Sequence, residues 1–239
     1  MLMVNSATFC IISTFFCTAC VIAGVYVAAS KLTPELRSRR TIEVTVLAIL
    51  WLIFTALLGL SGFLGNFSGM PPRLILFLPL VLGTSTLFVF SRWGTLLRDG
   101  LSLSTLVAFH LFRVLPETLL FLAYKEGIAP VQMSFVGHNF DIYSALAAPV
   151  AAFLIKKGGN KFWARAVAWG WNVIGLCLLF GILTVAVLST PTPFRMYDNE
   201  PANTFIATFP YVWLPGVLVF LAFGGHVLVV RKLLRQNNG

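Results

Sequence analysis

The sequence predicts an all-α, polytopic membrane protein with seven transmembrane helices, its N-terminus outside and its C-terminus in the cytoplasm. The first observation is composition: 58% of the 239 residues are hydrophobic, 10% are charged, and the mean hydropathy is +0.90. Because an ordinary soluble domain carries about 25% charged residues, this composition is typical of lipid-embedded chains. The second observation is length, since about 20 apolar residues for each span leave room for seven spans and short connections. We therefore expect a single transmembrane domain over residues 1–239.

Seven apolar runs, bounded by charged residues or by Pro and Gly clusters, each predict one helix. In chain order they are residues 5–29, 42–64, 74–91, 101–124, 137–155, 162–188 and 205–230. The first run has no Lys or Arg before it and is longer than the apolar part of a signal peptide, so we interpret it as a span. The fifth run is the weakest, because it must include His138, Asn139 and Asp141 to reach across a bilayer.

The basic residues predict the orientation. Of the 17 Lys and Arg residues, 13 fall on one side of this span list: Lys31, Arg37, Arg39, Arg40, Arg92, Arg98, Lys156, Lys157, Lys161, Arg165, Arg231, Lys232 and Arg235. Only Arg73, Lys125 and Arg195 fall on the other side, and Arg113 lies inside a span. Because cytoplasmic connections carry the excess of basic residues, the first side is cytoplasmic. The net charge of +9 is then a topology signal, and no basic helix face or arginine-rich tail indicates a nucleic acid partner.

The fourth span carries the most informative polar residues, His110, Arg113 and Glu117. Their spacings of three and four place them on one helix face. An ionised Arg113 near the bilayer centre costs about 2.5–3.5 kcal/mol on insertion scales, so it must face the bundle or water. Glu117, one turn away, is its expected partner. Pro116 cannot donate a hydrogen bond to the Phe112 carbonyl, which predicts a kink beside the two charges.

Other polar groups are expected at a similar depth on the outer side, at the start of the fifth span and in the loop between the last two spans. The predicted ligand-binding residues of an outward-facing pocket are Arg113, Glu117, Asn139, Asp141, Glu200 and Asn203, with His110, His138 and His226 as accessory candidates. A few convergent polar groups in a concave site are typical of ligand binding. The alternative is that Arg113 and Glu117 form a buried pair that only fixes helix packing.

The sequence predicts no catalytic residue and no metal site, and it leaves the cofactor unknown. The four cysteines lie inside apolar runs without the His spacing of a zinc site. A bis-histidine haem needs two imidazoles at one depth, and we expect His226 nearer the cytoplasmic face than His110, which disfavours haem. The seventh span has no interior lysine for retinal, and the hydrolase, metalloprotease and phosphate-loop motifs do not occur.

Three sequence segments are more specific indicators of a family than the apolar runs are. They are F-R-V-L-P-E, E-G-I-A-P-V-Q-M-S-F-V-G-H-N-F-D-I, and E-P-A-N-T-F followed by F-P-Y-V-W-L-P. In these strings the chain resembles an uncharacterised group of small seven-span bacterial integral membrane proteins, over about residues 109–149 and 193–233. The resemblance implies a bacterial origin and importance for Arg113, Glu117, Asn139 and Asp141, but no activity. This chain departs from the pattern at Ser134, where we expect Thr, and at His138, where we expect a larger or basic residue.

These observations leave two function classes open for a multi-pass protein of the bacterial cytoplasmic membrane. The first is a small-solute or proton-coupled transporter or sensor, with Arg113 binding an anion and Glu117 titrating. The second is a non-catalytic interaction subunit, in which a membrane protein partner replaces the small-molecule ligand and the polar groups only hold helices together. An intramembrane enzyme is a third reading, with Glu117, Asp141 and His138 as acid and base, but no nucleophile or metal site accompanies them.

Overall fold

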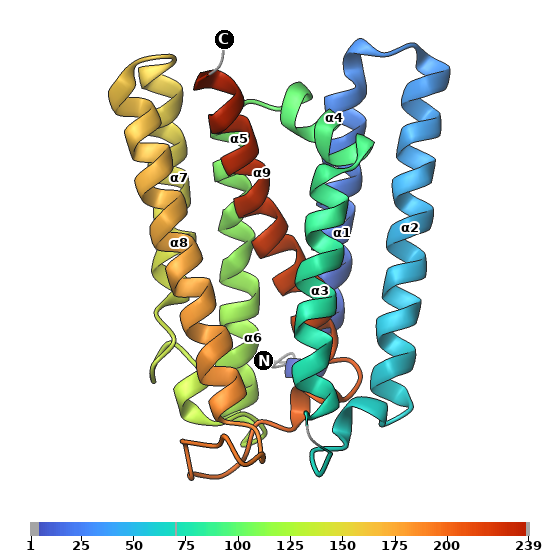
Figure 1. The fold of residues 1–239 in the computed structure, drawn as a ribbon, viewed down its shortest axis with the longest axis vertical. Helices are drawn as coiled ribbons and strands as arrows, with labels where there is room; N and C mark the ends of the chain where they lie inside the picture. Colours follow the sequence, from blue (N-terminus) through green and yellow to red (C-terminus); the bar gives the residue numbers. More distant parts are fainter. Residues whose placement is uncertain (1–4, 70, 238–239) are drawn as a thin grey trace.

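Long helices run side by side through a computed structural model that describes residues 5–69 and 71–237 (Figure 1). The helices are α1 (Ser6–Ala28), α2 (Pro34–Leu60), α3 (Arg73–Phe90), α4 (Arg92–Gly100), α5 (Leu103–Phe109), α6 (Val114–Lys125), α7 (Asp141–Gly158), α8 (Phe162–Leu188) and α9 (Phe220–Asn237). No strand occurs in these described ranges. The fold class is therefore all-α, as the sequence predicts.

Helix starts follow ordinary capping chemistry. The Asn5 side chain accepts a hydrogen bond from the Thr8 N–H at 2.8 Å and so begins α1. Thr33 caps α2, in which Pro34 occupies the first position, where a missing N–H costs nothing. Ser91 and Ser102 cap α4 and α5 in the same way. Each cap satisfies a backbone N–H group that has no partner within the first turn of its helix.

Two helical segments are not regular α-helix throughout. Between α5 and α6 the chain continues through a 3₁₀ turn at His110–Arg113, just before Pro116 in the first turn of α6. Before α9 it forms a π-helical segment at Leu214–Val219. Tighter or wider turns inside a long helix often mark functional sites, and here both border the buried polar residues described below.

Six helical segments of the described chain are long and apolar enough to cross a membrane. They are Ser6–Lys31, Pro34–Leu60, Arg73–Phe90, Leu103–Lys125, Phe162–Leu188 and Leu214–Arg235. The fifth predicted span is not among these six. Its helix begins at Asp141 rather than at residue 137, and it also contains Lys156 and Lys157. The six segments are compatible with an integral membrane protein.

Apolar side chains cover the outside of the bundle as well as its inside. Leu87, Val150 and Phe153 are each more than 60% exposed on helix surfaces, which water would disfavour and hydrocarbon tolerates. Two apolar clusters fill the interior, one around Leu119, Val212 and Leu218 and the other around Val107 and Val229. Polar side chains are buried between helices, and Arg113 is the largest fully buried side chain among the described residues.

Candidate functional site

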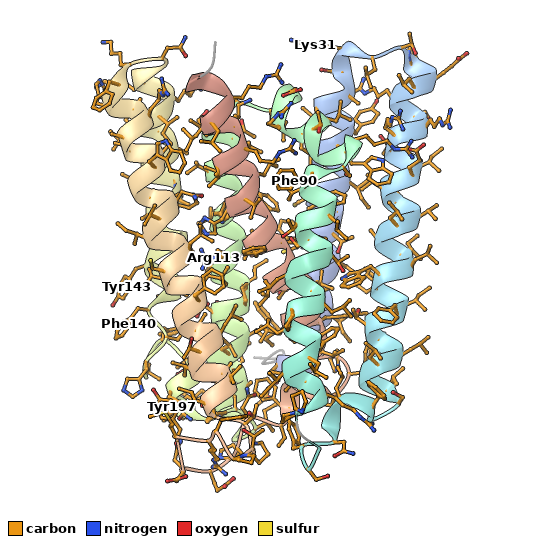
Figure 2. The ribbon with its side chains drawn as sticks, in the orientation of Figure 1. Lys31, Phe90, Arg113, Phe140, Tyr143 and Tyr197 are labelled. Carbon is orange, nitrogen blue, oxygen red and sulfur yellow. The ribbon has the colours of Figure 1, made fainter. Side chains whose placement is uncertain are left out.

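Arg113 lies inside the bundle, at the end of the 3₁₀ turn, and is only 1% exposed (Figure 2). Its Nε donates to Asp141 Oδ2 at 3.1 Å, and its Nη2 donates to Asp141 Oδ1. Its Nη1 donates to His226 Nε2 at 2.8 Å and lies 3.5 Å from the Gly175 carbonyl. The guanidinium therefore joins α7, α8 and α9 to the fourth predicted span through a bidentate ion pair and two further contacts.

The predicted pairing of Arg113 with Glu117 is wrong. No ion pair to Glu117 occurs in the described part of the chain, and Glu117 Oε2 instead accepts a hydrogen bond from Asn139 Nδ2. The cause is the packing of α7 against α8, α5 and the 3₁₀ turn, which brings the Asp141 carboxylate to the planar edge of the guanidinium. A bidentate contact of this kind is stronger than one made along a helix by a residue one turn away.

The chain just before α7 is folded to present Asn139 and Asp141 together. The Asn139 side-chain oxygen accepts from the Asp141 N–H at 3.0 Å, while its Nδ2 also donates to the Met133 carbonyl at 3.0 Å. Ser144, one turn into α7, lies 3.3 Å from Asp141 Oδ1. Asn139 therefore touches Glu117 with one end of its amide and orients the Asp141 backbone with the other.

The contacts of His226 fix its protonation pattern. A guanidinium only donates hydrogen bonds, so His226 Nε2 must accept from Arg113. The ring proton then lies on Nδ1, which donates to Asn172 Oδ1 at 2.9 Å. His226 is thus a neutral imidazole, whereas the amide nitrogen of Asn172 has no partner among the described residues.

His110 contacts the same group, and the expectation that His110 and His226 lie at different depths is wrong. Their ring centroids are 4.2 Å apart, and the His110 ring is 4.9 Å from Trp171. Two imidazoles in contact leave no room for a porphyrin between them. Both nitrogens of His110 are buried without a hydrogen-bond partner in the described part of the chain.

We call this group the Arg113 cluster. Its members are His110, Arg113, Glu117, Asn139, Asp141, Asn172 and His226. It contains one guanidinium, two carboxyl groups and two imidazoles, all of them at most 3% exposed. A cavity of about 70 Å³ reaches Arg113, Glu117 and Asp141 between otherwise apolar walls. Since about 10–15 Å³ of such volume holds one water, there is room for a few waters or a very small solute.

Three of the predicted site residues lie outside this cluster. Glu200 is an exposed loop residue, and a hydrogen bond from Arg195, followed by one from the Ala202 N–H, lowers the pKa of its carboxyl below the usual value. Asn203 is buried and donates to the Ala186 carbonyl at 2.9 Å, beside one wall of the cavity. His138 is exposed, with its ring 5.7 Å from that of Tyr197.

The sequence analysis does not include Asn172 among the predicted site residues, and it gives His226 only as an accessory candidate. Asn172 lies in the apolar run 162–188, and a lone amide in such a run is a detectable signal. His226 was placed too close to the cytoplasmic end, because the predicted last span ended at residue 230. The helix continues to Asn237, so His226 lies well inside it. Among the described residues, no group of three His, Cys, Asp or Glu side chains is arranged to hold a metal ion.

Comparison with known proteins gives a family. Residues 70–234 match a family described as "Domain of unknown function (DUF8737)", which spans both segments of the resemblance noted above and every member of the Arg113 cluster. Searches of curated proteins and of solved structures found no match. Because the family match covers more than half of the 239 residues, this protein belongs to the DUF8737 family.

Proposed function

We propose that this protein is a seven-span protein of a bacterial cytoplasmic membrane, with its N-terminus outside. The 13 basic residues lie in the turn after α1, at the start of α2, in α4, around the α7–α8 connection and at the end of α9, and these segments gather at one end of the bundle (Figure 1). This arrangement supports a cytoplasmic assignment for that end. The seventh span is α7, whose 18 residues reach about 27 Å at 1.5 Å per residue, close to the hydrocarbon thickness. Its two lysines lie at the basic end, and Asp141, in its first turn, is paired with Arg113 inside the bundle.

We infer further that the Arg113 cluster is a proton-binding site in a small-solute or proton-coupled transporter or sensor. The observation that carries this proposal is the sharing of one guanidinium by two buried carboxyl groups. Asp141 takes the bidentate contact, so among the described residues Glu117 has only the Asn139 amide as a hydrogen-bond partner. Two carboxylates and one guanidinium leave a net negative charge in low dielectric, and a proton on Glu117 cancels it.

In this proposal Asp141 and Arg113 form the fixed ion pair, and Glu117 is the titrating group. Glu117 also borders the 70 Å³ cavity, so a proton or a small polar solute reaches it there without displacing the ion pair. Asn139 is suited to both states of Glu117, because its amide hydrogen donates to a carboxylate oxygen or to the carbonyl oxygen of a carboxylic acid. Ionisable groups buried in a membrane domain commonly mark such pathways.

The proposal is tested by infrared spectroscopy of the reconstituted protein. We expect one carboxylic acid band that disappears when the pH is raised. Glu117→Gln should remove that band. Asp141→Asn should make the band disappear at a lower pH, because one guanidinium then balances the single remaining carboxylate. Glu126→Gln is the control, since Glu126, which directly follows α6, also accepts hydrogen bonds, from Ser6.

A second measurement addresses function. The melting temperature in detergent is recorded with a panel of small polar solutes at two pH values, for the wild type and Glu117→Gln. A solute that stabilises the wild type in a pH-dependent way, and loses that dependence in Glu117→Gln, supports transport or sensing. If no carboxyl group titrates and no solute stabilises the protein, the cluster only holds helices together and the interaction-subunit reading replaces this one.

A further inference from the structure

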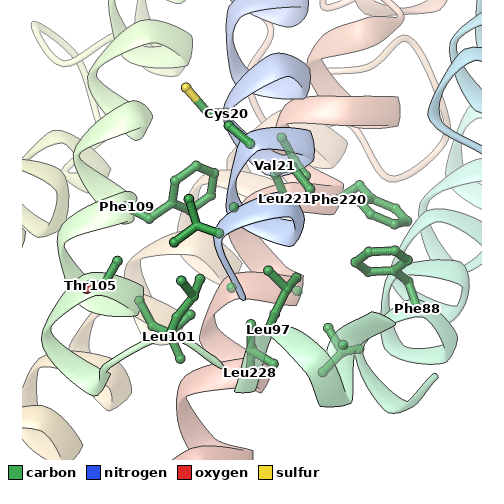
Figure 3. Close-up of a pocket in the computed structure, with 18 residues that line it drawn as sticks. Cys20, Val21, Phe88, Leu97, Leu101, Thr105, Phe109, Phe220, Leu221 and Leu228 are labelled. Carbon is green, nitrogen blue, oxygen red and sulfur yellow. The ribbon is translucent and has the colours of Figure 1, made fainter. Parts of the chain in front are cut away.

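An apolar groove runs between helices at the other side of α9 from the ion pair. It encloses about 280 Å³ and is lined by side chains of α1, α3, α4, α5 and α9 (Figure 3). Cys20 and Val21 come from α1, Phe109 from α5, and Leu221 and Leu228 from α9. Val27, at its edge, is 54% exposed, so the groove opens to the outside of the bundle.

A second cavity, of about 320 Å³, lies at the basic end of the bundle and is lined by charged side chains. These are Arg98 and Asp99 of α4 and Lys232 and Arg235 of α9. Arg98 and Arg235 both contact the Asp99 carboxylate. Lys232 Nζ donates to the Arg98 carbonyl at 2.6 Å, which fixes it at the end of α4.

The two spaces adjoin each other along the same two helices. On α4, Leu97 lines the apolar groove and the next residue, Arg98, lines the charged cavity. On α9, Leu228 lines the groove, and Lys232 and Arg235 follow it one and two turns later on the same helix face. The apolar groove therefore ends at the charged cavity, which we call the cationic mouth and which is formed by Arg98, Asp99, Lys232 and Arg235.

The mouth keeps a positive charge after its internal ion pairs are counted. Arg98, Lys232 and Arg235 surround a single acid, and Arg231 lies beside them, where it donates to the Val89 carbonyl at the groove edge. Asp99 is ionised at neutral pH, because hydrogen bonds from Arg98 and then Arg235 lower its pKa to about 2. Four cations and one anion leave a net charge of about +3 at this mouth.

We propose that this groove and its cationic mouth bind one anionic phospholipid, with an acyl chain in the groove and the phosphodiester headgroup at Arg98 and Arg235. An apolar slot open to the bundle surface suits a lipid chain, and a basic pocket between helices at the cytoplasmic side suits an anionic headgroup. A second copy of the chain is a poorer occupant, because the cationic mouth would then face another cationic mouth. This site is separate from the proposed proton site.

The test uses native mass spectrometry of the purified full chain with phosphatidylglycerol or phosphatidylcholine of identical acyl chains. We expect the wild type to retain phosphatidylglycerol in preference. Arg235→Gln should lower that preference about fivefold, the contribution typical of one basic residue near an anionic bilayer. Arg39→Gln is the matched control: Arg39 is 73% exposed and ion-paired to Glu43, much as Arg235 is 60% exposed and ion-paired to Asp99.

A second pair of variants tests the groove. A side chain at Gly24 points toward Leu97 and Leu101 at ordinary contact distances, so Gly24→Leu should fold and fill the slot, abolishing phosphatidylglycerol retention. Gly83→Leu, which meets open space on α3, should leave retention unchanged. Equal retention of both lipids by the wild type, an equal loss in Arg39→Gln, or normal retention by Gly24→Leu each overturns the proposal. A dimer that Gly24→Leu dissociates also overturns it, in favour of a second copy.

Discussion

Arg113 and Asp141, 28 residues apart in sequence, form a buried bidentate ion pair that links the fourth predicted span to the first turn of α7. The pair depends on tertiary packing, because neither residue is on the same helix as the other. It also determines the hydrogen-bond partner of the neighbouring acid. Because Asp141 occupies the guanidinium, Glu117 accepts a hydrogen bond from the Asn139 side-chain amide instead. The chemistry of the whole cluster therefore depends on which carboxylate Arg113 contacts.

The first prediction is that Arg113 and Asp141 are energetically coupled. Arg113→Ala and Asp141→Ala should each lower the free energy of unfolding in detergent by about 3–5 kcal/mol, because each leaves the other charge buried and unpaired. The double variant should lose less than the sum of the two. Arg195→Ala and Glu200→Ala provide a loop pair, with Glu200 73% exposed, whose effects should nearly add. Additive losses at Arg113 and Asp141 would show that they are not in contact.

The second prediction concerns the close approach of α8 to α9. A Cβ at Gly175 would lie 2.5 Å from His226 Cε1 and 3.5 Å from Arg113 Nη1, so Gly175→Ala must displace the imidazole. We expect a loss of about 1–3 kcal/mol in the free energy of unfolding, as is usual for overpacking. Gly181→Ala on the same helix meets open space and should be neutral or slightly stabilising. A neutral Gly175→Ala would contradict the packing of His226.

The third prediction is a pH dependence that originates at Asp99. The Arg98 and Arg235 hydrogen bonds lower the pKa of Asp99 from 3.8 to about 2. A carboxyl with a depressed pKa in the folded state stabilises the fold above its unfolded pKa and loses that effect as the pH falls. Asp99→Asn should therefore cost a constant amount at neutral pH, and the cost should disappear between about pH 4 and pH 2. Because Asp99 is 40% exposed, the cost should not exceed about 1 kcal/mol.

That measurement compares the free energy of unfolding of the wild type and Asp99→Asn in detergent at several pH values. Glu35→Gln, a change near the start of α2 on the same side of the bundle, is the control. A difference between wild type and Asp99→Asn that stays constant down to pH 2 would be inconsistent with the lowered pKa.

The fourth prediction concerns topology. Reporters active only in the cytoplasm, or only outside it, are fused after Arg40, Asn66, Arg98, Glu126, Gly159, Asn199 and Gln236. The signals should alternate, with the Arg40, Arg98, Gly159 and Gln236 fusions inside, because the basic residues gather on that side. Fusions after Glu126 and Gly159 bracket α7. If these two report the same side, α7 does not cross the membrane and the protein has six spans.

The hydropathy of the chain was sufficient to predict the six long apolar helical segments. Uninterrupted apolar runs of about 20 residues have one dominant solution in a bilayer, because every backbone polar group must be paired within the helix. The run 162–188 matches α8 at both ends, and the run 5–29 nearly matches α1. Polar residues within such runs stand out, so Arg113 and Glu117 were identified as buried groups without a structure.

Boundaries and partners depended on contacts that hydropathy does not record. The last helix continues through Arg231 and Lys232 to Asn237, because those basic side chains reach carbonyl oxygens of Val89, Arg98 and Leu101. His226 therefore lies about three turns before the end of the helix, where its Nε2 accepts a hydrogen bond from Arg113. The partner of Arg113 was likewise decided by packing: helix periodicity favours Glu117, but α7 brings the Asp141 carboxylate to the guanidinium edge. Local periodicity fixes which face a residue occupies, whereas only the assembled bundle fixes what that face meets.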